Sequence, residues 1–112
     1  MRVLVVMDPI ENVNLKKDSS MAMLWAASRR GHTLGYALQQ DLYIEQGKAF
    51  GLISALKVFE DDDHYYELGE KQKESIADYD VVLMRKDPPF DMNFVYTTYI
   101  LEQAEREGAW II

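Results

Sequence analysis

The run VLVVM at residues 3–7 is followed at once by Asp8 and Pro9, and this short stretch decides the fold class. Every residue of the run is apolar, so a strand built from it would be buried on both faces. Strands of this kind are typical of a parallel sheet that has helices on each side. Pro9 lacks a backbone N–H for further strand pairing, so the strand should end near Asp8. The stretch therefore predicts a central strand of an α/β domain.

The residues that follow predict a strand–helix–strand unit. A helix should begin near Asp18, Ser19 and Ser20, because these residue types cap helix N-termini. Apolar residues then recur at helical spacing as far as Arg29-Arg30-Gly31, where two cations and a glycine are typical of a helix end. Residues 33–38 are expected to form the second strand.

A second apolar run, VVLM at residues 81–84, predicts another central strand. A helix is expected from about Asn93 to Glu107, and residues 109–112 are expected to form a last strand. Natural domains seldom stop on a bare apolar strand, because an uncovered edge invites aggregation. We therefore expect that the chain was cut at a domain boundary.

The middle of the chain predicts additional strand pairing. Residues 42–44 and 49–59 flank Gln46-Gly47-Lys48, which favours a hairpin turn. Residues 61–74 are mostly polar, and we expect exposed strands or loops there. The expected fold is thus α/β, with a mostly parallel sheet of about four central strands plus an added hairpin.

Composition and charge exclude several classes of function. The 112 residues carry a net charge of −7, and residues 57–112 hold six basic against fourteen acidic side chains. An acidic chain repels phosphodiester backbones, so nucleic acid is not an expected partner. The lack of cysteine excludes disulfide scaffolds and thiol nucleophiles. No apolar stretch is long enough to span a membrane, and we expect a soluble, cytoplasmic domain without a membrane partner.

The two apolar runs point to a ligand-binding crevice. In an open α/β sheet, ligands bind beyond the carboxyl ends of the strands, where the strand order reverses. We expect strands 3–7 and 81–84 to be central neighbours, with the N-terminus of the first helix close by. A helix N-terminus with hydroxyl groups and a guanidinium would suit a carboxylate or phosphate. The residues expected at this crevice are Asp8, Ser19, Ser20 and Arg85.

A structural interpretation of the same residues remains open. Asp18, Ser19 and Ser20 can serve only as a helix cap, and Asp8 and Arg85 can form a structural ion pair. His32 and His64 are not expected to form a metal site, because they are far apart in sequence and have no carboxylate at metal-ligand spacing. The chain has no glycine-rich phosphate loop and no set of catalytic residues.

Five segments carry a resemblance to a known family. They occur in this order along the chain: Met7-Asp8-Pro9-Ile10, Lys16-Lys17-Asp18-Ser19-Ser20, Asp41-Leu42-Tyr43, residues 83–91 (LMRKDPPFD) and Tyr99-Ile100-Leu101-Glu102. Together they resemble the N-terminal domain of bacterial glutathione synthetase, over essentially the whole chain. Residues 47–76 carry little of the likeness.

The resemblance implies both a fold and an activity. The chain would be a three-layer, Rossmann-like pre-ATP-grasp domain, and the ATP-grasp domains of the full-length ligase would be absent from residues 1–112. The family joins γ-glutamylcysteine to glycine, forming glutathione, through an acyl phosphate made from ATP with Mg²⁺. ATP and Mg²⁺ would bind the missing domains, so the chain alone would be inactive. The full-length family members form homodimers or homotetramers.

The resemblance also assigns roles to particular residues. Arg85 would bind a carboxylate of the dipeptide or product, while Ser19 and Ser20 would position the peptide. Asp8 would shape the floor of the crevice, and Lys17 is a further candidate for substrate binding. Asp87-Pro88-Pro89 would fix the chain direction, with a cis bond at one proline. No catalytic, cofactor-binding or metal-binding residue is assigned to this segment.

Two alternatives to the ligase stay open. The first is a free-standing α/β module for binding or subunit interaction, without catalysis. The second is a receiver-like or Rossmann-like nucleotide domain, which the missing glycine-rich loop disfavours.

Overall fold

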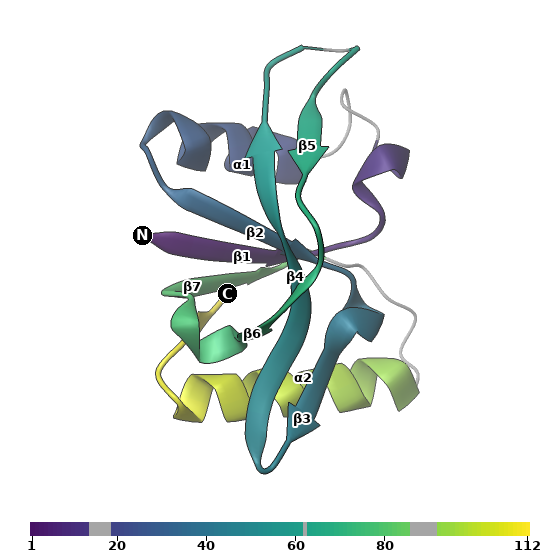
Figure 1. Cartoon of the computed structure of the whole chain (residues 1–112), viewed down its shortest axis with the longest axis vertical. Coiled ribbons are helices and arrows are strands. Elements are labelled where there is room, and N and C mark those ends of the chain that lie inside the picture. Colours follow the sequence, from purple (N-terminus) through teal and green to yellow (C-terminus); the bar gives the residue numbers. More distant parts are fainter. Residues whose placement is uncertain (14–18, 62, 86–91) are drawn as a thin grey trace.

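Four parallel strands form one half of the sheet in the computed structural model, which describes residues 1–13, 19–61, 63–85 and 92–112. Strand β1 (Arg2–Val6) lies between β2 (Thr33–Ala37) and β7 (Val81–Met84), and it is parallel to both. Strand β8 (Trp110–Ile111) pairs in parallel with the other side of β7. The two apolar runs are central neighbours, as the sequence predicts (Figure 1).

An antiparallel half is built on one long strand, β4 (Lys48–Val58), which pairs with β2. The sheet order is β3-β4-β2-β1-β7-β8, and two further strands, β5 and β6, also pair with β4. The strands that pair only with β4 are β3 (Leu42–Glu45), β5 (Tyr66–Leu68) and β6 (Gln72–Ser75). Among the described residues, antiparallel pairing is therefore as extensive as parallel pairing, and "mostly parallel" was the wrong description of the sheet.

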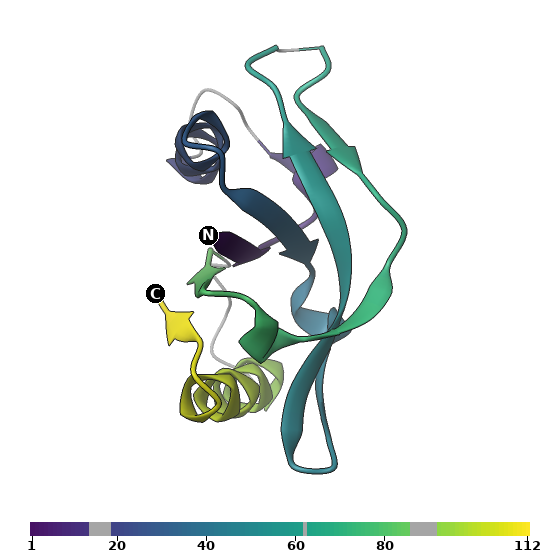
Figure 2. The same cartoon turned by 60° about the vertical axis from the view of Figure 1, so that its left-hand side comes forward.

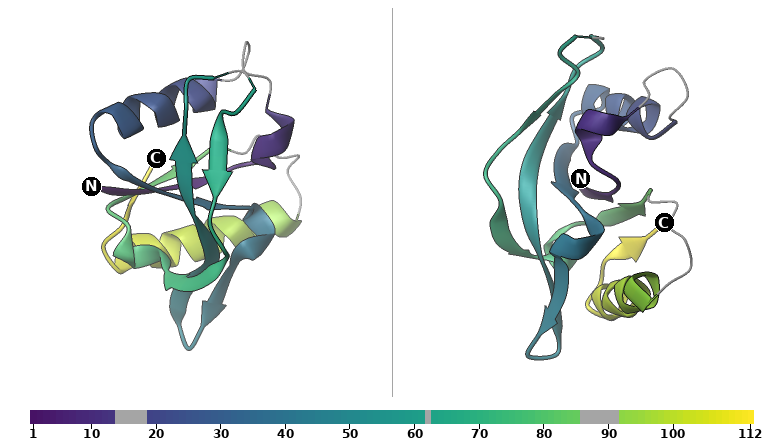
Figure 3. Two further views of the ribbon diagram at one scale, coloured as in Figure 1. Left: turned by 45° about the horizontal axis from the view of Figure 1, so that its top comes forward. Right: turned by 90° about the vertical axis from the view of Figure 1, so that its right-hand side faces the viewer.

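The expected hairpin explains how the antiparallel half begins. Gln46 and Gly47 both have positive φ, at 51° and 76°, and they join β3 to β4 as a two-residue turn. Such turns match the twist of paired strands and need residues that tolerate positive φ. After β2 the chain therefore enters the hairpin of β3 and β4, and no α-helix lies between β2 and β4. Figure 3 shows β4 running along the length of the molecule, from the side of α1 to the side of α2.

Two helices cover opposite faces of the parallel strands (Figure 2). Helix α1 (Ser19–Arg29) packs on one face and α2 (Met92–Arg106) on the other. Alternate residues of β1 enter two separate cores: Val5 packs in the core that contains Leu24 of α1, and Leu4 packs in the core that contains Ile100 of α2. This arrangement explains why the first run is apolar throughout, and it confirms the α/β class.

Both helices end with the same local motif. At the end of α1, the N–H of His32 donates to the carbonyl of Ala27 at 3.1 Å, and the N–H of Gly31 donates to that of Ser28 at 3.0 Å. Gly31 has a φ of +80°, the left-handed conformation that the sequence predicts there. The end of α2 repeats this pattern around Gly108, which sends the chain directly into β8.

Short 3₁₀ helices complete the described fold. They are η1 (Ile10–Asn12), η2 (Gln39–Asp41) and η3 (Ile76–Asp78). The first of them follows β1 directly, so it lies in the connection that leads toward α1.

Candidate functional site at the carboxyl ends of β1 and β7

The strand order reverses between β1 and β7, and both strands end at the same edge of the sheet. Val6 is opposite Met84, the last residue of β7, and the N–H of Arg85 donates to the carbonyl of Val6 at 2.8 Å. The residues that leave the two strands are therefore adjacent. In open α/β sheets this is the position where ligands bind.

Arg85 meets the first turn of α1 at this edge. Its Nε donates to the hydroxyl oxygen of Ser20 at 3.2 Å, although the two residues are 65 positions apart in the sequence. Ser20 is only 4 % exposed, whereas Arg85 is exposed. A buried hydroxyl thus holds a guanidinium at the carboxyl ends of β1 and β7. The convergence of Ser20 and Arg85 that the sequence predicts is present in the structure.

The remaining predicted residues are placed less completely. Asp8 is exposed and lies two positions beyond the end of β1, and Ser19 is the first residue of α1. Lys17 lies outside the described residues. The predicted turn at Asp87-Pro88-Pro89, with its cis bond, also lies outside them.

Two tyrosines, which the sequence analysis did not single out, hold the connection after β1. The N–H of Ile10 donates to Tyr36 Oη at 3.1 Å, and Tyr65 Oη donates to the carbonyl of Ile10 at 2.7 Å. Tyr36 comes from β2, and Tyr65 directly precedes β5. The N–H and the carbonyl of Ile10 are thereby anchored from two separate segments, β2 and the residue before β5. An isolated Tyr carries no sequence signal for such a contact.

Burial changes the acid–base properties of both tyrosines. Desolvation raises the pKa of Tyr36, and the hydrogen bond from Ile10 partly opposes this shift. Desolvation also raises the pKa of Tyr65, with a smaller contribution from the nearby Tyr66. Both phenols therefore stay protonated at neutral pH, and Tyr65 keeps the proton that it donates to the carbonyl of Ile10.

The two histidines occupy separate places. The ring Nδ1 of His32 lies 3.2 Å from the amino terminus, while His64 Nε2 pairs with Glu67 Oε1 at 3.1 Å. Within residues 1–13, 19–61, 63–85 and 92–112, no three His, Asp or Glu side chains gather closely enough to hold a metal ion.

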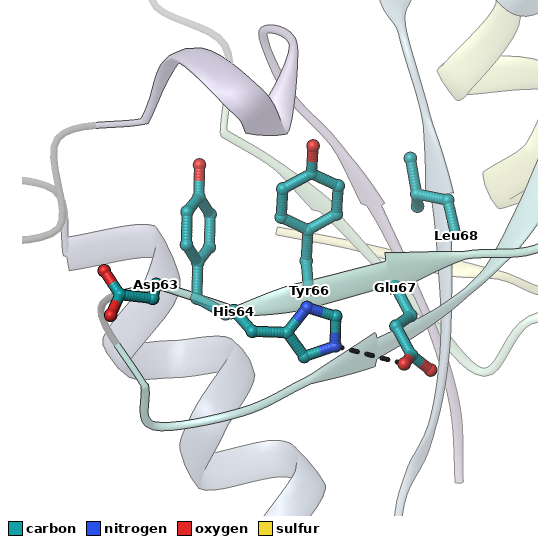
Figure 4. Close-up of a pocket in the computed structure, with 6 residues that line it drawn as sticks. Asp63, His64, Tyr66, Glu67 and Leu68 are labelled. Atoms are coloured by element: carbon teal, nitrogen blue, oxygen red, sulfur yellow. Dashed lines mark hydrogen bonds and ion pairs between the residues drawn. The ribbon is translucent and has the colours of Figure 1, made fainter.

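Two surface hollows are lined by residues other than Ser20 and Arg85. The first is a broad depression of about 610 Å³ along residues 63–68, where His64 faces Glu67 (Figure 4). The ring of His64 also stacks on that of Phe59, with the two ring centres 5.3 Å apart. His64 and Glu67 pair with each other there, and the Tyr65 hydroxyl donates to the carbonyl of Ile10. The second is an apolar groove of about 220 Å³ between α2 and the end of β8.

Comparison with known proteins connects this geometry to a family. The family model described as "Prokaryotic glutathione synthetase, N-terminal domain" matches residues 1–112. The chain belongs to this family. The resemblance seen in the sequence is thus confirmed. In this member of the family, Ser20 and Arg85 meet where the strand order reverses.

Curated relatives support the same assignment. The chain is 56 % identical over 111 residues to the glutathione synthetase of Pseudomonas putida, and 54 % identical over 111 residues to that of Pseudomonas aeruginosa. It is 52 % identical over 108 residues to the glutathione synthetase of Salmonella typhi. These matches cover 96–99 % of this chain but only 34–35 % of each relative, so this chain spans about a third of the length of these relatives.

Neither helix in the described part of the chain is long and apolar enough to cross a bilayer.

Proposed function

We propose that this chain is the substrate-side domain of a full-length glutathione synthetase that joins γ-glutamylcysteine to glycine at the expense of ATP, through an acyl phosphate. The observation that carries the proposal is the Arg85 guanidinium, held by Ser20 at the carboxyl ends of β1 and β7. The family membership of residues 1–112 supports the ligase activity for the longer protein.

Arg85 has the chemistry that this dipeptide requires. γ-Glutamylcysteine carries carboxylates at neutral pH, and a planar guanidinium can donate two parallel hydrogen bonds to one carboxylate. In the proposed complex, Arg85 binds one dipeptide carboxylate and orients the peptide along the sheet edge. Ser19, Lys17 and Asp8 complete the substrate surface, with Asp8 able to accept from the dipeptide amine.

The described residues of this chain offer no set of ligands that would fit Mg²⁺. The described residues hold no cluster of three possible metal ligands, and the sequence has no glycine-rich phosphate loop. We therefore assign ATP and Mg²⁺ to the part of the longer protein outside this chain. The contribution of residues 1–112 is to bind and orient the peptide, so the chain alone would be inactive.

The test is Arg85→Ala in the full-length enzyme. Loss of one charge-assisted hydrogen-bonding group should raise the KM for γ-glutamylcysteine by about 10- to 100-fold and leave the KM for ATP nearly unchanged. Arg29→Ala is a matched control, because Arg29 is an exposed arginine at the far end of α1, where it pairs with Glu60. An unchanged KM for the dipeptide in Arg85→Ala would reject the binding role.

We also propose that the full-length protein acts in the cytoplasm as a homodimer or homotetramer. This assembly is what the resemblance to the family implies for the full-length protein. Light scattering on the purified full-length enzyme measures the subunit number directly, and a monomeric mass at assay concentration would contradict the proposal.

A further inference from the structure

The hydrogen bond between Ser20 and Arg85 separates two roles that the sequence cannot distinguish. A serine at a ligand crevice can contact the ligand itself, or it can fix another side chain that does. The Ser20 hydroxyl lies 3.2 Å from Arg85 Nε, and the serine is 4 % exposed. Its oxygen therefore already has a hydrogen-bond partner within the protein, and little of the residue is in contact with solvent.

We infer that Ser20 is a positioning residue that orients the Arg85 guanidinium, and that it is not itself a substrate contact. This inference rests on the proposed binding of a dipeptide carboxylate by Arg85. A guanidinium can bind a carboxylate along the edge formed by Nε and one terminal nitrogen, or end-on through its two terminal nitrogens. Because Ser20 accepts the single Nε–H, a carboxylate cannot use the edge that includes Nε without displacing Ser20.

The surroundings make Ser20 well suited to this role. Its two neighbours on the inner face of α1, Met21 and Leu24, are fully buried and anchor the helix in the core that also contains Val5. The Arg85 backbone is fixed as well, by its hydrogen bond to the carbonyl of Val6. Ser20 Oγ thus fixes the far end of a side chain whose near end is already held. An arginine ordered before binding loses less conformational entropy when the ligand arrives.

A double-mutant cycle in the full-length enzyme tests this inference. We expect Ser20→Ala to raise the KM for γ-glutamylcysteine by about 3- to 10-fold, with the KM for ATP unchanged. Ser20→Thr keeps the hydroxyl and should recover much of the loss. Once Arg85 is replaced by Ala, adding Ser20→Ala should cause no further increase in KM, because the residue that Ser20 positions is gone. Ser28→Ala, in the last turn of the same helix, is the control and should leave the KM unchanged.

A structural measurement accompanies the kinetics. The Nε–H signal of Arg85 in ¹⁵N NMR spectra of this chain should shift, and its proton should exchange faster with water, in Ser20→Ala but not in Ser28→Ala. Thermal unfolding of each variant shows whether any change in KM comes from loss of the folded state.

The outcomes separate this inference from the proposed function. Independent, multiplicative losses in the double mutant would show that Ser20 contacts the substrate directly, which overturns the positioning role and leaves Arg85 as a binding residue. An unaltered dipeptide KM and Nε–H signal in Ser20→Ala would also overturn it. An unaltered KM in Arg85→Ala would overturn both proposals, because no bound carboxylate would then need an oriented guanidinium.

Discussion

Gly35 lies beneath the ring of Tyr79, and replacing this glycine by alanine gives a sharp test of the packing. A Cβ added at Gly35 would lie 2.5 Å from Tyr79 Oη and 2.8 Å from the ring carbons Cε1 and Cζ. Tyr79 is 4 % exposed, its hydroxyl donates to Glu74 Oε2 at 3.2 Å, and the Arg2 guanidinium lies 4.5 Å from its ring centre. The ring therefore has no free direction in which to move.

The expected cost follows from three contributions. Forcing a methyl group into a packed site costs about 1–3 kcal/mol. Displacing the Tyr79 hydroxyl from Glu74 costs about 1 kcal/mol more. Alanine returns about 0.5–1 kcal/mol, because it restricts the unfolded chain more than glycine does. Gly35→Ala should therefore lower the free energy of unfolding by about 1–3 kcal/mol, which corresponds to a decrease in Tm of about 5–15 °C.

Equilibrium unfolding of the 112-residue chain in urea measures this loss. Gly69→Ala is the matched control, because its Cβ would meet atoms of Ala55 at ordinary distances of 3.6–3.8 Å. The control should be neutral or slightly stabilising. If Gly35→Ala proves as stable as the unmodified chain, with the same urea dependence, the packing of Tyr79 on Gly35 is not what the structure shows.

Three further predictions concern pH, the connection after β1, and nucleotide binding. Desolvation, reinforced by the nearby Glu74 carboxylate, raises the pKa of Tyr79 to about 12. Because this folded-state pKa exceeds the unfolded value, the neutral phenol of Tyr79 stabilises the folded state. This stabilisation, at most about 2–3 kcal/mol, is present below about pH 10 and is lost as the pH rises toward 12. Urea titrations at pH 9 and 11.5 should show this fall, and Tyr79→Phe should reduce it; an equal fall in the variant would contradict the assignment. Tyr65→Phe leaves the carbonyl of Ile10 without the hydroxyl that donates to it at 2.7 Å, so it should cost about 1 kcal/mol in the same assay, and an unchanged stability would argue against the anchor. Isothermal titration calorimetry of this chain with Mg²⁺ and ATP should show no binding, since the described residues hold no cluster of metal ligands. Binding of ATP with a micromolar dissociation constant would favour the nucleotide-domain alternative.

Local patterns in the sequence predict most elements of the parallel half. The expected strand at residues 3–7 is β1, the expected helix end at Gly31 is the end of α1, and the helix expected from about Asn93 begins at Met92. These predictions succeed because the signals are short-range: an apolar run, a glycine with positive φ, and residues repeated at helical spacing. The strand-order rule also places Arg85 at the end of β1, as the structure shows, while its role in binding stays a prediction.

The antiparallel half could not be derived in this way. Residues Gln72–Ser75 of β6 pair with Phe50–Ile53 of β4, although the β6 stretch is polar and shows no alternation. Its partner lies about twenty positions away, and nothing local to either segment specifies the register. The sequence therefore indicates exposed strands or loops, and the pairing with β4 is a result of the tertiary structure.

What the sequence alone determined is the class of the fold, the family, and the identity of the charged group at the crevice. The tertiary structure decided which atoms meet: Ser20 with Arg85, Tyr36 and Tyr65 with Ile10, and Tyr79 with Gly35. Periodicity records only how a residue relates to its near neighbours along the chain. Contacts between residues 26 to 65 positions apart depend on how the helices and sheet pack together, and that packing is fixed by the two cores as a whole.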